Sequence, residues 1–250
     1  FLQARQWDVE KATLMYRNHM EWRKTMELDD WIPTEAGPVP KFLHTFTYPE
    51  IEQVKRAYNF THHGVCKDGK PVYFDRLGTI NYKGMCDVSS AERVFRYFVW
   101  YAEATQHYRL AAASVECGTH CGKAFYVLDL KGFGLSKLNA ETRAFLKEFS
   151  SMASDNYPES MYKTYIVNAP FVFTGAWSIV SKFLDPNTVA KFKIMGGPKE
   201  FMPKLLEVVD KSQIPDFLGG EDETCDFITE KGPWASHMPT RMGPRVERLD

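Results

Sequence analysis

The chain has 250 residues, which is long enough to bury a sizeable core. Hydrophobic residues make up 44% of it and charged residues 25%, a balance typical of soluble globular proteins. The formal net charge of −1 creates no overall field that would attract nucleic acid or an anionic membrane, so any recognition of phosphate must be local. The five cysteines are an odd number, which favours reduced thiols in a cytosolic protein over a disulfide framework.

Hydrophobic periodicity and turn residues predict alternating helices and strands along the chain. Helices are expected over residues 8–26, 50–58, 89–108, 140–154, 171–184 and 199–209. Strands are expected over residues 61–65, 71–75, 124–130, 163–167 and 191–195. The strand at 124–130 is nearly continuously apolar, as expected of a central strand that is buried on both faces. This alternation predicts an α/β fold with a largely parallel sheet.

An uncharged run of 18 residues, from 164 to 181, is the most informative segment. Its length is at the lower edge of a membrane-spanning helix, but Asn168-Ala169-Pro170 interrupts it. We therefore expect a strand before Pro170 and a helix after it. The apolar residues of that helix lie on most of its circumference: Phe171, Phe173, Trp177, Ile179, Val180, Phe183 and Leu184. Such a helix must be buried or face lipid, so we interpret it as a mobile cover over an apolar cavity.

Two motifs that suggest other chemistry have ordinary explanations. Gly132-Phe133-Gly134 follows a predicted strand, but Lys137 stands where a dinucleotide-binding loop requires its third glycine. Cys117, His120 and Cys121 are metal-ligating residue types, but a structural zinc site needs four ligands. We therefore predict neither a cofactor nor a metal, and no group of residues indicates an enzyme. A nucleotide-dependent oxidoreductase is the remaining catalytic alternative.

Several motifs together resemble the CRAL-TRIO lipid-binding family, and most of all its secretory phosphatidylinositol/phosphatidylcholine transfer proteins. The motifs that carry the resemblance are Phe1 to Arg5, Gly69 to Phe74, Asp129 to Gly132, Tyr157-Pro158-Glu159, Ile166 to Pro170, Phe183 to Lys191 and Phe217 to Gly220. The resemblance implies a CRAL-TRIO fold, in which a largely parallel sheet and flanking helices form a hydrophobic lipid cavity. It also implies a gate helix, which the helix at 171–184 matches.

The resemblance assigns a phosphatidylinositol head-group site to Arg5, Glu159, Thr188 and Lys191. These residue types suit a phosphodiester, because arginine donates in a fork and lysine supplies a point charge. We expect Glu159 to pair with Lys191 when no lipid is bound. The gate and apolar cavity are assigned to Phe171, Phe173, Trp177, Val180, Phe183 and Leu184.

The head-group site for a second lipid departs from the family pattern. Tyr73 matches one of the two tyrosines that hold a choline head group in relatives, but His62 occupies the position of the other. Ala124 and Tyr126 replace the serine and threonine of the central strand. The second ligand is therefore left open between a different phospholipid, a sterol and another hydrophobe, with His62, Tyr73 and Tyr126 as its candidate contacts.

The resemblance divides the chain into three parts. Residues 1–45 are expected to be the end of a helical N-terminal region with a linker, 46–225 the lipid-binding domain, and 226–250 a C-terminal extension that is loosely held from Gly232. Because the chain starts at Phe1, it is expected to be a piece of a longer protein.

The predicted function is transfer of phospholipid, with binding or sensing of another hydrophobic ligand as the alternative. We expect a cytoplasmic monomer that meets membranes transiently, with Golgi or endosomal membranes and lipid kinases as candidate partners.

Overall fold

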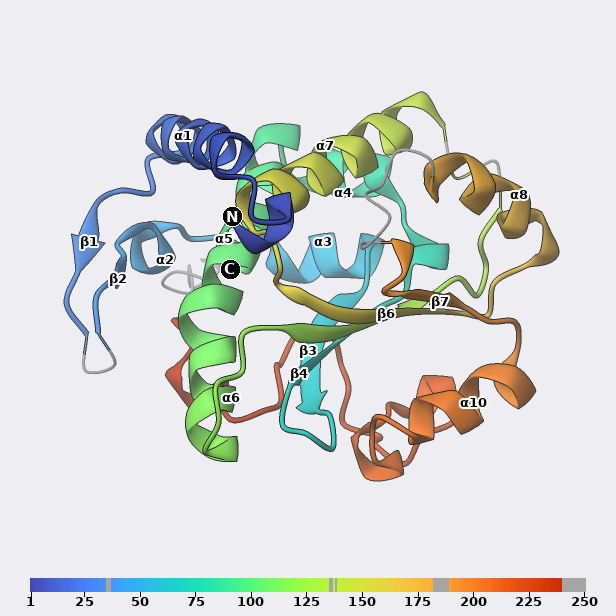
Figure 1. The fold of residues 1–250 in the computed structure, drawn as a ribbon. Coiled ribbons are helices and arrows are strands. Elements are labelled where there is room, and N and C mark those ends of the chain that lie inside the picture. The colour runs from blue at the N-terminus through green and yellow to red at the C-terminus, as the bar shows by residue number, and fades with distance from the viewer. Residues whose placement is uncertain (35–36, 135–136, 138, 182–188, 240–250) are drawn as a thin grey trace, which may run out of the picture.

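A five-stranded sheet forms the centre of the fold (Figure 1). The computed structural model describes residues 1–34, 37–134, 137, 139–181 and 189–239. The strands lie in the order β3-β4-β5-β6-β7; β3 and β4 are antiparallel, and the other neighbours are parallel. Their bounds are β3 Phe60–Val65, β4 Pro71–Asp75, β5 Ala124–Asp129, β6 Met161–Val167 and β7 Phe192–Ile194. The predicted α/β fold with a largely parallel sheet is therefore confirmed.

Helices cover the sheet on both sides (Figure 1). The α-helices of the described residues are α1 Val9–Thr25, α2 Phe42–Thr45, α3 Ile51–Ala57, α4 Tyr82–Val88, α5 Ala91–Ala104, α6 Leu110–Cys117, α7 Ala140–Asn156, α8 Phe171–Val180 and α10 Pro198–Leu206. A small hairpin of β1 Trp31–Ile32 and β2 Val39–Pro40 lies in the segment predicted to be a linker. The short helices α2 and α4 were not predicted, because so few residues show no clear period.

The two faces of the sheet differ in how completely they are covered. Side chains alternate along a strand, so Phe125 and Val127 point to one face, and Tyr126 and Leu128 point to the other. Phe125 and Val127 are fully buried in a cluster with Phe201 of α10, and we name this side the α10 face. The opposite side, the α8 face, packs on a cluster that includes Phe98 of α5 and Phe145 of α7; Ala124 is fully buried there, and Tyr126 and Leu128 are partly buried. The prediction that the central strand is buried on both faces is thus correct for the α10 face, and on the α8 face it holds fully for Ala124 and partly for Tyr126 and Leu128.

The long helix predicted at 89–108 begins as expected but extends further. Ser90, rather than Ser89, is the N-cap of α5, and its Oγ accepts a hydrogen bond from the backbone N–H of Arg93 at 3.2 Å. After Ala104 the chain makes a π-helical turn, Thr105–Arg109, and continues directly into α6. Two polar side chains of the π-helical turn, Thr105 and Arg109, are buried in tertiary contacts, Arg109 with 0% exposure.

We expect a Ser90→Ala variant to lose about 1 kcal/mol of unfolding free energy, because an orphan N–H of the first turn loses its acceptor. Urea unfolding monitored by circular dichroism would measure this. Ser151, an exposed residue inside α7, provides a matched control whose replacement by alanine should not destabilise the protein. Equal stability of the Ser90→Ala variant and the native chain would contradict the capping role.

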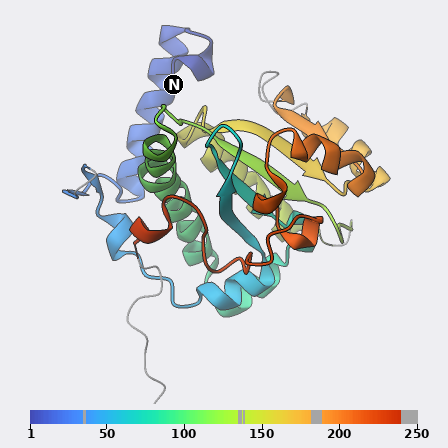
Figure 2. The same ribbon diagram turned by 90° about the horizontal axis from the view of Figure 1, so that it is seen from below.

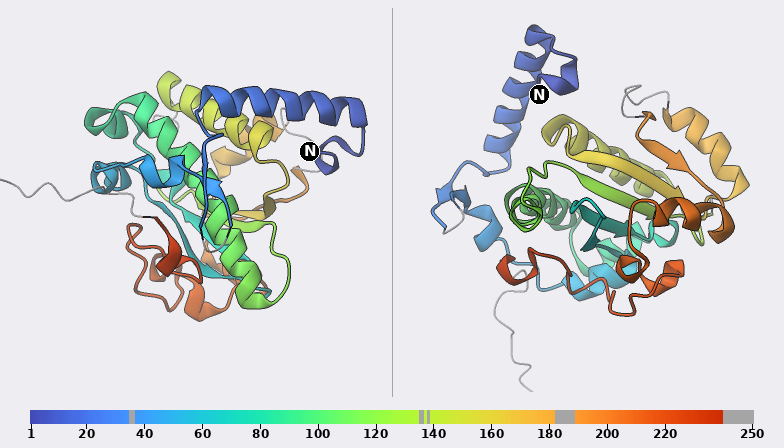
Figure 3. Two further views of the ribbon diagram at one scale, coloured as in Figure 1. Left: turned by 90° about the vertical axis from the view of Figure 1, so that its left-hand side faces the viewer. Right: turned by 60° about the horizontal axis from the view of Figure 1, so that its bottom comes forward.

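Helix α1 lies along the outside of the domain, next to α7 (Figure 3). Its start agrees with the prediction, because the Asp8 side chain accepts a hydrogen bond from the backbone N–H of Lys11. The Trp22 ring meets the Tyr157 ring edge-on at 5.9 Å. The buried Arg23 guanidinium donates to Glu103 of α5 at 3.0 Å. These contacts fix α1 to α5 and to the end of α7, just before the turn into β6.

The segment after α10 runs back beneath the sheet (Figure 2). The backbone N–H of Gly64 in β3 donates to the carbonyl of Lys231 at 2.7 Å. Glu230 is buried against Arg109, and Trp234 is fully buried beside His62. The expectation of a loosely held chain from Gly232 is therefore wrong for Trp234. Residues 240–250 of the predicted extension lie outside the described residues, and the boundary at 225 stays a prediction.

Candidate functional site

Three charged residues meet where neighbouring parallel strands begin. Lys123 directly precedes β5, Glu159 lies in the turn before β6, and Lys191 directly precedes β7. The Nζ atom of Lys123 lies 2.7 Å from Oε2 of Glu159, and the Nζ atom of Lys191 lies 3.3 Å from the same oxygen. All three side chains are partly buried, between 22% and 31% exposed. We name this group the Glu159 cluster.

A tight turn fixes the position of Glu159. Its φ of +60° is a left-handed conformation that is uncommon for a residue with a side chain. The Oγ atom of Ser160 donates to the carbonyl of Tyr157 at 2.7 Å and closes the turn. Strained backbone of this kind persists only where the surroundings hold it, and it is common at functional sites. The carboxylate of Glu159 is therefore presented from a rigid support.

The two lysines keep Glu159 ionised. The hydrogen bond from Lys123 is the largest influence that lowers the pKa of this carboxyl group below its usual value. Partial burial acts in the opposite direction, and the nearby charge of Lys191 adds to the lowering. With one carboxylate between two ammonium groups, the Glu159 cluster has a formal charge of +1. It suits an anion with a single negative charge.

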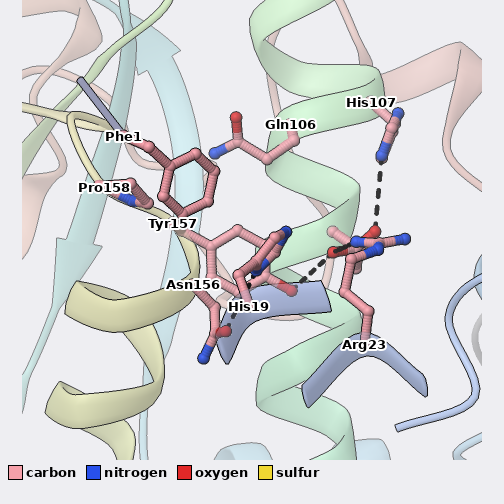
Figure 4. A pocket seen from close by; sticks show the side chains of 9 residues that line it. Phe1, His19, Arg23, Gln106, His107, Asn156, Tyr157 and Pro158 are labelled. Carbon is pink, nitrogen blue, oxygen red and sulfur yellow. Dashed lines mark hydrogen bonds and ion pairs between the residues drawn. The ribbon is translucent and has the colours of Figure 1, made fainter. Parts of the chain in front are cut away.

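The N-terminal segment lies beside this turn. Phe1 and Pro158 line the same small pocket, of about 220 Å³, together with Gln106, Asn156 and Tyr157 (Figure 4). Arg5 follows four residues after Phe1, is half-buried, and its guanidinium donates to the carbonyl of Ala4 at 3.3 Å. Among the described residues no carboxylate pairs with Arg5. The structure thus brings together Glu159 and Lys191 of the predicted head-group site and places the Arg5 segment nearby; Thr188 lies outside the described residues.

The pocket itself contains an internally paired polar network (Figure 4). The Glu103 carboxylate accepts hydrogen bonds from Arg23 at 3.0 Å and from the Tyr157 hydroxyl at 2.7 Å. Its other oxygen lies 3.5 Å from Nε2 of His107. Nδ1 of His19 lies 3.1 Å from Oδ1 of Asn156. These pairs join α1, α5 and α7, so the network supports the turn that carries Glu159.

The candidate contacts of a second ligand also lie together. His62 of β3 is paired in register with Tyr73 of β4, which is paired with Tyr126 of β5. The ring centroids of each pair are 5.2 Å apart. Nδ1 of His62 lies 2.9 Å from the Tyr101 hydroxyl, and burial lowers the pKa of His62 well below its usual range. His62 is therefore neutral near pH 7 and offers no positive charge to a phosphate.

The α8 face is only partly open, because Tyr73 of β4 and Thr164 and Ile166 of β6 are buried on it. Burial raises the pKa of Tyr126 to about 12. Yet Tyr126 is only half-buried, as are Leu128, Phe192 and Ile194 on the same face. This is the position in which the sequence predicts an apolar cavity.

Helix α8 covers this face through aromatic contacts. The Trp177 ring lies 4.9 Å from the Phe192 ring of β7, and Phe173 lies 5.7 Å from Phe133. Phe171, in contrast, is 93% exposed, and Val172 is 53% exposed. No helix in the described ranges is long and apolar enough to cross a membrane. The side chain of Val180 and all of Phe183 and Leu184 lie outside what the structure describes.

Comparison with known families explains this arrangement. A family model of the CRAL/TRIO domain matches residues 55–220, more than half of the chain. The chain belongs to the CRAL/TRIO domain family. The matched CRAL/TRIO residues fall within the predicted domain at 46–225, whose ends stay a prediction. The crystal structure of Sfh5 aligns over 90% of this chain and 72% of its own, with a TM-score of 0.64 and 17% identity, and so supports the CRAL-TRIO fold.

Three relatives are similar over almost the whole chain, and their names agree with the predicted resemblance. The phosphatidylinositol/phosphatidylcholine transfer protein SFH4 of Arabidopsis thaliana is 35% identical over 97% of this chain and 38% of its own length. SFH12, a protein of the same description from the same plant, is 34% identical over 94% of this chain and 41% of its own length. The SEC14 cytosolic factor of Kluyveromyces lactis is 33% identical over 94% and 75%. This chain therefore spans about two fifths of the plant relatives.

Sequence reasoning missed Lys123. The signal was present, because Lys123 directly precedes the strand predicted at 124–130, and Lys191 is the first residue of the strand predicted at 191–195. Parallel strands of one sheet begin at a common edge, so residues in these positions meet. The resemblance drew attention to Glu159 and Lys191 and left their neighbour on β5 unexamined.

Proposed function

We propose that this chain binds one phospholipid at a time and transfers it between membranes, with phosphatidylinositol as its favoured ligand. The observation that carries the proposal is the junction at Lys191 and Phe192. Lys191 belongs to the Glu159 cluster, and the next residue, Phe192, is partly buried and contacts Trp177 of α8 on the α8 face. A charged anion site thus adjoins an apolar lining, which is the combination that a phospholipid requires. The names of the relatives support the same ligand class.

The magnitude of the hydrophobic effect explains why such a carrier needs a cover. A diacyl lipid has roughly 30 methylenes, so exposing both chains to water costs on the order of 20 kcal/mol at ~0.8 kcal/mol each. In this proposal α8 is the gate that hides the chains in water. Its exposed Phe171 and Val172 meet the bilayer, where an apolar surface replaces water. The gate opens there, releases one lipid and admits another.

The head group is held by charge and by hydrogen bonds in this proposal. Lys191 and Arg5 donate to the phosphodiester, Thr188 adds a hydroxyl, and Glu159 restrains Lys191 while the site is empty. Hydrogen bonds to a charged partner contribute about 1.5–3 kcal/mol each. The binding needs no catalytic step, and we propose a carrier rather than an enzyme.

A transfer assay tests the head-group site. We expect the double variant Lys191→Ala, Thr188→Ala to move labelled phosphatidylinositol between vesicles at least about tenfold more slowly than the native chain, because two charge-assisted contacts are lost. Lys193 on the same strand provides the matched control, since it is exposed and its Nζ lies over the Tyr165 ring on the α10 face. Its replacement by alanine should leave transfer unchanged. Unchanged transfer by the double variant would refute the assignment.

A second ligand other than a choline lipid is favoured by one observation. The Tyr73 hydroxyl already donates to Asp75 at 3.3 Å, and its neighbour His62 is buried and neutral. We therefore propose that the second ligand is a hydrophobe with little charge, such as a sterol. Mass spectrometry of the lipid that co-purifies with the intact chain would name it directly, and a phosphatidylcholine would contradict this part of the proposal.

A further inference from the structure

The two lysines of the Glu159 cluster are not equivalent. Lys123 is the closer partner, at 2.7 Å compared with 3.3 Å for Lys191, and both contact the same carboxylate oxygen. A second link also holds Lys123 near Glu159: the backbone N–H of Ala124, the next residue, donates to the carbonyl of Ser160 at 2.9 Å. The strand start that carries Lys123 is therefore tied to the turn that carries Glu159.

The net charge of the Glu159 cluster with and without Lys123 shows what this lysine contributes. A pair made of Lys191 and Glu159 alone is neutral, and an arriving phosphodiester would compete with the carboxylate for the same ammonium group. If Lys191 turned to the phosphate, Glu159 would be left partly buried and unpaired beside a second anion. An unpaired, partly desolvated charge raises the free energy of the lipid-bound state. With Lys123 present, Glu159 keeps its closer partner while Lys191 moves.

We propose that Lys123 is a positioning residue of the head-group site, which retains Glu159 so that Lys191 is free to bind the lipid phosphate. This inference rests on the proposed function. It assigns a role to a residue that the resemblance does not include. The strained backbone of Glu159 fits the same role, because a carboxylate that stays in place must be held from both its backbone and its side chain.

The test uses five variants of the whole chain in the phosphatidylinositol transfer assay. These are Lys123→Ala, Lys123→Arg, Glu159→Gln, the double variant Lys123→Ala, Glu159→Gln, and Lys204→Ala. We expect Lys123→Ala to lower transfer about tenfold, the effect of one charge-assisted contact, and Lys123→Arg to keep most of it. Lys204 is the matched control, because its Nζ also lies 2.7 Å from a glutamate, Glu207, on α10. Its replacement should not change transfer.

The double variant separates positioning from direct binding. If Lys123 acts by holding Glu159, removal of the carboxylate charge makes it unnecessary, and the double variant should match Glu159→Gln to within about twofold. An equal tenfold loss in the Glu159→Gln background would show that Lys123 contacts the phosphate itself and would overturn the positioning role. Wild-type transfer by Lys123→Ala would also overturn it. A native chain that moves no phosphatidylinositol would instead refute the proposed function, so the two failures are distinguishable.

Discussion

Replacing Arg109 by methionine is expected to lower the free energy of unfolding by about 3–5 kcal/mol, because a buried carboxylate loses its counterion. Arg109 is fully buried and donates two hydrogen bonds to Glu230, from Nε at 2.8 Å and from Nη2 at 2.6 Å. Its Nη1 donates to the carbonyl of Tyr101 and to Oγ1 of Thr105, each at 2.9 Å. Burial alone would lower the pKa of Arg109, but the adjacent Glu230 carboxylate raises it above its usual value. The pair therefore joins the π-helical turn to the C-terminal segment.

Chemical unfolding of the Arg109→Met variant provides the measurement. The double variant Arg109→Met, Glu230→Met should recover most of the loss, because apolar side chains of similar size replace both charges. Arg17, which is exposed on α1, is the control, and its replacement by methionine should change stability by less than about 0.5 kcal/mol. If the single and double variants are equally unstable, the lost counterion is not the cause.

The Arg109–Glu230 pair also shows what sequence reasoning could not reach. The strands and long helices were predictable, because periodicity and turn residues are local signals. The two members of this pair are 121 residues apart, and neither belongs to a periodic pattern. A buried ion pair looks in the sequence like two surface charges. The segment after Gly232 was misjudged for the same reason, because the burial of Trp234 depends on its contact with His62 of β3 rather than on local composition.

The candidate site was predictable in part. Glu159 and Lys191 were paired from the family motifs, and the structure brings them to 3.3 Å. Lys123 was missed because its role depends on which strands are neighbours and on where each begins. The helix α8 was predictable from its lack of charge, whereas the half-buried state of Tyr126 was not. Periodicity distinguishes the two faces of a strand but cannot show which residues of a face stay partly exposed.

The Asp75→Asn variant is expected to become more stable than the native chain as the pH rises above about 4, by about 4 kcal/mol near pH 8. Asp75 ends β4, is 5% exposed, and accepts hydrogen bonds from the hydroxyls of Tyr58 at 2.7 Å and Tyr73 at 3.3 Å. Its other oxygen, Oδ1, is buried without a hydrogen-bond partner among the described residues. Burial raises the pKa of Asp75 from 3.8 to about 7, although the two tyrosine hydrogen bonds act in the opposite direction.

The raised pKa determines how the stability contribution changes with pH. Between about pH 4 and pH 7 the folded protein binds a proton at Asp75 that the unfolded chain has released, so stability falls as the pH rises. Below this window Asp75 is protonated in both the folded and the unfolded state, so the free-energy cost of burying its negative charge is absent. Above this window the folded protein carries the buried charge, and the full cost applies. Asparagine keeps an oxygen that accepts hydrogen bonds from both tyrosines. Because it has no charge, it removes the cost of burying one.

Urea unfolding from about pH 5 to pH 8 would measure the effect, and the native chain should lose about 2–3 kcal/mol relative to Asp75→Asn across this range. Asp155, an exposed carboxylate at the end of α7, provides the control, because its replacement by asparagine should leave the pH profile unchanged. Parallel profiles for the native chain and Asp75→Asn would mean that Asp75 ionises at its ordinary pKa in the folded protein. Because Tyr73 donates to Asp75, a profile that shifts when a second ligand binds would also locate that ligand beside β4.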